Sequence, residues 1–240
     1  MVNRILALGL ALVLWAVPAW AQTLVQFCSS RDTASNSCAV DAFATITEGS
    51  AIFLATRGSD SEDISGWSGC ALGTWARAYR IASGALVNEL WYLLNASAGA
   101  CAPVPSFSVG TEVRVRGLEF SGVATTSALD QTASTTGSGD LDSGATSTTT
   151  QATELLIGSA ATNNYQTTVT GTSGWALWTT WDGNRTVLLY RVVSATGTYN
   201  ATATLSDAGS WAGGIATFKA AGGGDAGAAP RLTLLGVGPQ

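Results

Sequence analysis

The sequence predicts an all-β protein, built as an antiparallel β-sandwich of about ten to twelve strands. Short runs rich in Val, Ile, Leu, Thr and aromatic residues alternate with clusters of Gly, Ser, Asn and Asp. Helical periodicity is almost absent after the N-terminal segment. Hydrophobic residues make up 46% of the chain and charged residues 11%. This balance excludes a disordered chain, which lacks the apolar residues needed for a core.

The candidate strands follow in chain order, at residues 23–27, 42–47, 51–56, 75–81, 86–94, 112–120, 154–160, 166–169, 176–181, 186–193, 199–205 and 211–218. In residues 112–120, Val113 and Val115 alternate with Arg114 and Arg116, which is the period of a strand. Residues 178–190 predict a hairpin with its turn at Asp182-Gly183-Asn184, because Gly and Asn accept positive φ angles. In residues 199–205, small or apolar side chains alternate with Asn and Thr.

Two segments do not fit the strand pattern. Residues 125–153 are a run of Ser, Thr, Gly and Ala, which predicts a long, threonine-rich surface excursion with room for one irregular strand. A domain boundary there is the alternative, but neither half alone has enough strands, so we expect a single domain over residues 22–220. Residues 221–240 have the composition of a flexible tail. Their apolar end either docks on the domain or attaches to another protein.

The first 21 residues are typical of a secretory signal peptide. Arg4 precedes the apolar run 5–17, and Ala19 and Ala21 form a small-x-small site before Gln22. An uncleaved anchor is the alternative, but the run is shorter than the roughly 20 residues of a spanning helix. We therefore expect a secreted protein, extracellular or on the surface of a cell or virion. No membrane span should remain after cleavage.

An oxidising compartment would pair the four cysteines, Cys28, Cys38, Cys70 and Cys101. Four cysteines allow three pairings. We favour Cys28–Cys38 with Cys70–Cys101, because this pairing closes two separate loops. A metal site or a reactive thiol is the alternative, although no CxxC pair is present.

The composition limits the chemistry. The chain contains no histidine, which excludes a Ser-His-Asp triad and histidine metal ligands. Its net charge of −5 argues against a nucleic-acid partner. Lys219 is the only lysine, and no glycine-rich stretch carries the lysine of a phosphate-binding loop. These observations predict a protein that is not an enzyme and has no cofactor.

Two acidic clusters remain, at residues 60–63 and 140–142. We expect them to be solvated loop charges. A calcium ion bound by loop oxygens is the second possibility, and a pair of hydrolytic carboxylates is the third.

Tryptophan supplies the candidate ligand site, because an indole ring can stack on the apolar face of a sugar. Core packing is the alternative and is expected for Trp91 and Trp211. Two tryptophans stand among loop residues and are the candidates for ligand contact, one in the Gly/Ser-rich stretch 65–69 and one at the hairpin turn with polar neighbours. The candidate ligand-binding residues are Trp67, Trp181, Asp182, Asn184 and Arg185.

Several short motifs occur in a recognisable order, namely Leu24-Val25-Gln26, residues 48–52, Leu90-Trp91-Tyr92, residues 118–130, residues 198–204 and residues 211–219. Together they resemble a jelly-roll β-sandwich module of secreted bacterial, tailed-phage and metagenomic proteins, over roughly residues 23–220. Two positions differ from that pattern, since Ala124 replaces an Asp and Ala128 replaces a Pro. If that Asp serves a polar site, the site is weakened here. The family has no settled activity, so the resemblance implies the fold more than a function.

We therefore expect a non-catalytic extracellular binding module with a carbohydrate ligand or another surface partner. The first alternative is a self-assembling structural subunit of a fibre, decoration or surface layer, joined through its tail or an edge strand. The second is a glycan-active hydrolase or lyase.

Overall fold

The computed structural model describes residues 21–29, 38, 42–59, 63–107, 113–178, 184–207 and 209–222. All but the last residue of the expected signal peptide, and the tail from residue 223, lie outside these ranges. Within them the regular elements are strands and none is a helix, which confirms the all-β prediction. Among these same residues, no helix long and apolar enough to cross a membrane occurs.

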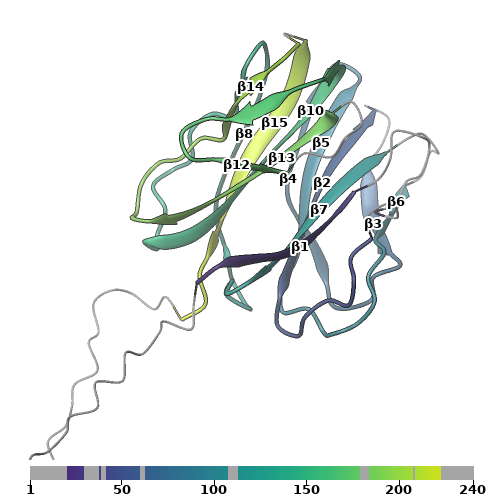
Figure 1. The fold of residues 1–240 in the computed structure, drawn as a ribbon, viewed down its shortest axis with the longest axis vertical. Helices are drawn as coiled ribbons and strands as arrows, with labels where there is room; N and C mark the ends of the chain where they lie inside the picture. Colours follow the sequence, from purple (N-terminus) through teal and green to yellow (C-terminus); the bar gives the residue numbers. More distant parts are fainter. Residues whose placement is uncertain are drawn as a thin grey trace, which may run out of the picture.

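Two five-stranded antiparallel sheets lie face to face (Figure 1). The N-terminal sheet has the order β1 (Thr23–Ser29), β7 (Arg114–Ser121), β2 (Ala51–Ser59), β5 (Leu86–Leu93) and β4 (Trp75–Ser83). The C-terminal sheet has the order β12 (Ala176–Trp178), β13 (Asn184–Ser194), β10 (Thr153–Gln166), β15 (Ser210–Lys219) and β8 (Leu129–Ser138). Each large sheet therefore comes from one half of the chain.

The two sheets share an apolar core between them. Phe53 of β2 and Phe218 of β15 meet edge to face, with ring centroids 4.7 Å apart. Leu90 and Leu118 from one sheet and Leu155 from the other belong to the same buried cluster. This apolar contact between the inner faces supports the predicted β-sandwich.

Two small sheets cover the outer faces. The strands β3 (Ile64–Ser68) and β6 (Val104–Phe107) pair with each other, and Ile64 packs in the outer core of the N-terminal sheet. A sheet of β11 (Val169–Gly171), β14 (Thr202–Leu205) and β9 (Leu141–Asp142) packs on the C-terminal sheet. Both faces of each large sheet are thus covered over much of their length, which explains why strands such as β5 are buried on both sides.

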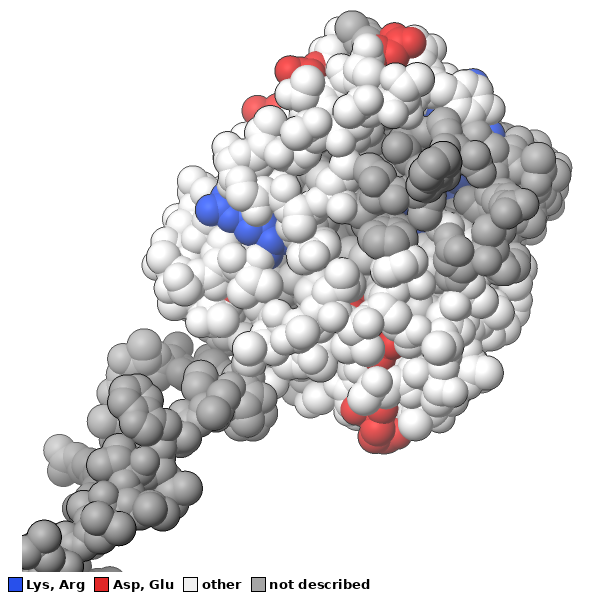
Figure 2. All heavy atoms as spheres, viewed as in Figure 1, with Lys and Arg blue, Asp and Glu red and all other residues white. Residues whose placement is uncertain are grey.

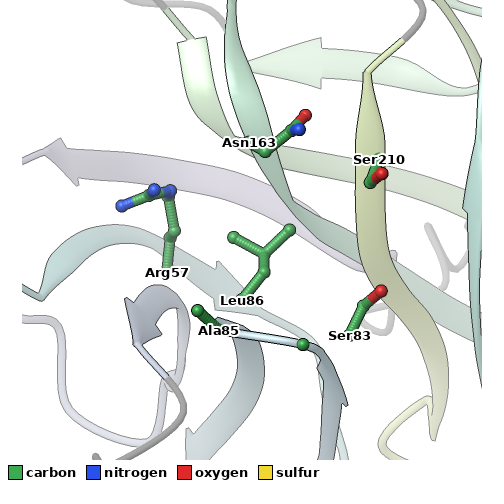
Figure 3. Close-up of a pocket in the computed structure, with 7 residues that line it drawn as sticks. Arg57, Ser83, Ala85, Leu86, Asn163 and Ser210 are labelled. Atoms are coloured by element: carbon green, nitrogen blue, oxygen red, sulfur yellow. The ribbon is translucent and has the colours of Figure 1, made fainter.

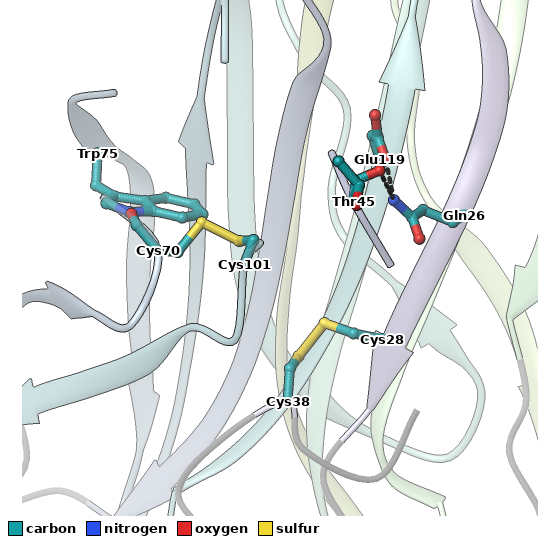
Figure 4. The surroundings of a disulfide bond; sticks show 8 residues. All are labelled: Gln26, Cys28, Cys38, Thr45, Cys70, Trp75, Cys101 and Glu119. Carbon is teal, nitrogen blue, oxygen red and sulfur yellow. Dashed lines mark hydrogen bonds between the residues drawn. A yellow bond between two sulfur atoms is a disulfide. The ribbon is translucent and has the colours of Figure 1, made fainter. Parts of the chain in front are cut away.

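Both disulfides have the expected pairing, Cys28–Cys38 and Cys70–Cys101 (Figure 4). The four cysteines are buried in the outer core of the N-terminal sheet. Two disulfides suggest an oxidising extracellular environment. Each bond fastens a loop segment to this outer core.

Most of the predicted strands are present, with bounds shifted by a few residues. The strand predicted at residues 42–47 is wrong, since only an isolated bridge joins Ile46 to Gly99 there. The pairing of Ala176 with Tyr190 confirms the antiparallel hairpin between β12 and β13. The centre of its turn, at residues 179–183, lies outside the described residues.

The Ser/Thr-rich excursion is more ordered than expected. It contains the ten-residue edge strand β8 as well as β9. After β9, the backbone N–H groups of Ser143, Thr146 and Thr149 donate to the carbonyls of residues 201, 199 and 197. The hydroxyls of the same three residues accept hydrogen bonds from the N–H groups of residues 201, 199 and 197. Every third residue of this segment is therefore hydrogen-bonded to residues 197–201, which lead into β14.

Candidate functional site

Three indole rings gather on the outer face of the N-terminal sheet, and we call Trp67, Trp75 and Trp91 the tryptophan face. Trp75 and Trp91 lie on the neighbouring strands β4 and β5, and β3 places Trp67 against both. The ring centroid of Trp67 is 5.6 Å from that of Trp75 and 6.2 Å from that of Trp91. Trp91 is buried, whereas Trp67 and Trp75 are half-buried. Part of each of those two side chains therefore remains accessible.

The local structure around Trp75 is fixed by the second disulfide. The indole Nε1 of Trp75 donates to the carbonyl of Cys70 at 3.4 Å, and Figure 4 shows the ring beside the Cys70–Cys101 bond. The Nε1 of Trp67 is buried and has no hydrogen-bond partner within the described part of the chain. Trp75 is thus hydrogen-bonded to the segment that carries the disulfide, and Trp67 has an N–H donor that no described group accepts.

A cluster of four charged side chains lies next to the tryptophan face. Arg77 and Arg80 on β4 both reach Glu89 on β5, at 3.4 and 3.2 Å. They also contact Asp63, which precedes β3. The Nε1 of Trp91 donates to Glu89 at 2.6 Å, and the guanidinium of Arg77 lies 5.3 Å from the Trp91 ring centroid. The charged cluster therefore continues directly from the aromatic rings.

The two carboxylates of this cluster differ in environment. The Glu89 side chain is 1% exposed, and this burial raises its pKa despite the opposing effects of Trp91 and the two arginines. The side chain of Asp63 is 68% exposed. Its hydrogen bond with Arg77 lowers its pKa. Asp63 is thus an accessible anion, and Glu89 holds the two arginines in place from below.

Only part of the predicted ligand-binding set can be placed. Trp67 lies in strand β3 and packs against other rings, so its expected position in an exposed loop is wrong. Trp181 and Asp182 lie outside the described residues, as does the side chain of Asn184. Arg185 is the second residue of β13, and its guanidinium lies 3.8 Å from the ring centroid of Tyr165. Trp67 and Arg185 therefore belong to different sheets.

The acidic clusters make contacts within the protein. Asp63 pairs with arginines, and residues 60–62 lie outside the description. Asp140 accepts the N–H of Leu205 at 3.0 Å, and Asp142 accepts the N–H of Gly144 at 3.0 Å. Over the described ranges, no three His, Cys, Asp or Glu residues converge on a possible metal position. Calcium binding by the loops stays a prediction.

A cavity of about 440 Å³ opens at one end of the sandwich (Figure 3). Arg57 and Leu86 line it from the N-terminal sheet, and Asn163 and Ser210 line it from the C-terminal sheet. The Nε of Arg57 donates to the carbonyl of Thr162 at 3.1 Å. Arg57 and several neutral polar groups can hold a small polar molecule here, and no carboxylate is among the described residues that line the cavity.

The sequence interpretation missed Trp75, Arg77, Arg80 and Glu89. Their positions on two neighbouring strands were a usable signal, but no site was predicted from them. What makes them a candidate site is β3, a short strand that the pattern did not predict. Comparisons of the chain with protein-family models, with curated proteins and with solved structures find no match.

Proposed function

We propose that the protein is a secreted, non-catalytic binding module whose ligand is a carbohydrate held at the tryptophan face. The observation that carries the proposal is the pair of half-buried rings, Trp67 and Trp75, beside the exposed carboxylate of Asp63 and the guanidinium groups of Arg77 and Arg80. An indole offers a flat apolar surface to a sugar ring. Charged donors and acceptors at its edge can bond the hydroxyl groups, which gives orientation and specificity.

The distribution of charge supports a neutral ligand. Few charged side chains lie on the face shown in Figure 2, and its acidic groups gather at the two ends. At the tryptophan face, the two carboxylates are matched by two arginines. A glycan with few charges fits this surface better than a polyanion does, because a polyanion needs a field of one sign.

Other parts of the proposal rest on the sequence. Secretion is inferred from the signal-like N-terminus, and a non-catalytic role is inferred from the missing histidine. Jelly-roll connectivity also stays a prediction. In this fold, the strands of each large sheet come from a separate half of the chain, and a jelly-roll assignment has to be consistent with that order.

The test is a glycan-array screen of the wild-type chain, followed by binding constants for the best glycan. We expect Trp67→Ala and Trp75→Ala each to weaken binding by about two- to tenfold, because an aromatic contact contributes roughly 0.5–1.5 kcal/mol and 1.4 kcal/mol is tenfold in affinity. The matched control is Trp211→Phe, since Trp211 is buried in the other sheet and its Nε1 has no hydrogen-bond partner among the described residues. Near-UV circular dichroism should first show that each variant is folded.

An assembly subunit is the second candidate, and the edge strand β8 favours it. Its ten residues border only β15 within the C-terminal sheet, and polar side chains line it with alternating exposure. An unblocked edge can pair with a strand of another chain. Sedimentation of the wild type should then depend on concentration. If β8 joins the copies, Thr136→Lys should remove the concentration dependence. If the tail joins them, deletion of residues 222–240 should remove it.

A further inference from the structure

A second polar cluster lies on the outer face of the C-terminal sheet, on three neighbouring strands. Asp130 is on β8, Lys219 is on β15, and Glu154 on β10 is paired with Lys219 in the β10–β15 register. The Nζ of Lys219 is 3.3 Å from Oδ1 of Asp130. Lys219 is the only lysine of the chain, so the one primary amine among its side chains lies against a carboxyl group.

The carboxyl group of Asp130 is ionised before any reaction, because the effect of burial, which raises its pKa, is outweighed by hydrogen bonds from Thr150, Glu154 and Lys219, which lower it. Its side chain is 4% exposed, so water has little access to it. The backbone N–H of Thr150 donates to Oδ2 at 2.6 Å, and the Thr150 hydroxyl donates to Oδ1 at 2.6 Å. Donors fixed on both oxygens stabilise the negative charge that develops there when a nucleophile adds to the carbon.

Glu154 adds a proton carrier. The residue is completely buried. Burial first, and then the neighbouring Asp130, raise the pKa of Glu154 to about 7. A group with this pKa both gives and accepts a proton near neutral pH. The cluster thus combines an amine, a carboxyl group, donors on the carboxyl oxygens and a proton carrier.

We propose that Lys219 and Asp130 become joined by an intramolecular amide bond between β15 and β8, with Glu154 transferring protons during its formation. The Asp130 carboxylate first takes one proton from the Nζ ammonium, which frees the lone pair of the nitrogen. That lone pair adds to Cγ of Asp130, and an N–C bond forms. One Cγ–O bond breaks, and that oxygen leaves as water with two protons that come from Nζ. Glu154 gives a proton to the departing oxygen and takes one back from the nitrogen, so it ends as it began. The overall change is ammonium plus carboxylate to amide plus water, with no oxidant or reductant.

Such a bond would attach an edge strand covalently to its only neighbour in the C-terminal sheet. The link would close a loop between residues 130 and 219, which neither disulfide constrains. A covalent loop limits the unfolded chain whatever the redox conditions, by the argument that applies to a disulfide. This inference is independent of the carbohydrate proposal, because it concerns the opposite sheet.

The test is mass spectrometry of the purified, folded chain after reduction and alkylation of the cysteines. We expect an intact mass lower by one water than the mass of the same unlinked chain. A succinimide at any aspartate also removes one water, so the tryptic peptides decide. Because an acylated lysine resists trypsin, residues 117–185 and 192–231 should appear as one linked species.

Three variants separate the roles of the residues. Lys219→Arg keeps the positive charge but should leave the two peptides unlinked, at the full intact mass. Glu154→Gln keeps the size of the side chain and should lose most of the link. Asp130→Asn should link with loss of ammonia in place of water. Circular dichroism of each variant confirms that it is folded.

The proposal is overturned if the folded wild type yields residues 117–185 as a free peptide and a second peptide that ends at Lys219. The cluster is then an ion pair only. If Glu154→Gln is linked as completely as the wild type, the assignment of proton transfer to Glu154 is overturned.

Discussion

Gly117 lies at a tightly packed point of the outer core, beside the first disulfide. A Cβ atom built on this residue would lie 2.6 Å from Sγ of Cys28 and 2.8 Å from side-chain atoms of Leu54 and Phe43. Real Cβ atoms do not make contacts this short. The glycine in the middle of β7 is therefore required by packing and not by a turn.

We expect Gly117→Ala to lower the free energy of unfolding by about 1–3 kcal/mol, because overpacking forces neighbouring side chains and backbone to move. The matched control is Gly66→Ala on β3, where no atom lies within 4 Å of the added Cβ. Urea unfolding of the two variants makes the comparison. Equal stabilities would show that the outer core is loose enough to accept a methyl group.

Glu154 makes stability depend on pH in a predictable direction. Its pKa is raised from 4.5 to about 7 in the folded protein, so the folded chain binds this proton more tightly than the unfolded chain. The stabilising effect is complete below pH 4.5 and is lost as the pH rises through about 7. The loss amounts to about 3 kcal/mol, at 1.36 kcal/mol per pKa unit.

Glu154→Gln should therefore flatten the dependence of the unfolding free energy on pH between about 4.5 and 7. The measurement is denaturant unfolding of both proteins at several pH values in that window. Parallel curves for the wild type and the variant would contradict the raised pKa.

At the scale of elements, the sequence pattern predicted best the strands that combine a regular period with large apolar side chains. It failed for β3 and β8 for a physical reason. β3 contains Gly66, and the exposed positions of β8 alternate with small, partly buried ones, so neither carries an apolar stripe. The tryptophan face depends on β3, which is why Trp67 was selected by sequence and its partners were not.

The ordered structure of the threonine-rich segment after β9 could not be predicted from the sequence, for a different reason. Its buried residues recur every third position, which matches neither the period of a strand nor that of a helix. The hydroxyl of Thr146 accepts the N–H of Tyr199 at 3.1 Å, and Thr146 is 4% exposed. Hydrogen bonding, rather than apolar burial, selects the residue type here.

Thr146→Val should lower the free energy of unfolding by about 1–3 kcal/mol, because the N–H of Tyr199 loses its acceptor in a buried place. Thr148→Val is the matched control, since Thr148 is exposed on the same segment. Thermal unfolding compares them. If both substitutions have the same effect, the hydroxyl does not hold this segment.

At the scale of the whole molecule, the disulfides fasten only the N-terminal half. Their cysteines are 10 and 31 residues apart in sequence. By loop closure, replacing Cys28 and Cys38 with Ser should cost about 3 kcal/mol, and replacing Cys70 and Cys101 about 4 kcal/mol. Guanidinium unfolding of the two double variants measures this. Losses below about 1 kcal/mol in both would show that the bonds do not contribute to the fold in this way.

The pairing of the cysteines and the all-β class could be predicted because each depends on local spacing and composition. The two outer layers could not, because most of their strands are so short that the sequence does not show which face of which sheet they cover. Arg77 of β4 and Asp63 before β3 meet only when the chain folds back over the sheet. A surface site assembled from such contacts can be identified in the structure, but the hydrophobic pattern of the sequence does not predict it.

The most direct measurement of the central claim is an NMR titration of the indole Nε1–H signals with the glycan that binds best. Sugar seated on the tryptophan face should shift the signals of Trp67 and Trp75 in a saturable way and leave that of Trp211 unchanged. The account is contradicted if no glycan moves the Trp67 and Trp75 signals, or if the shifts fall on Trp181 alone.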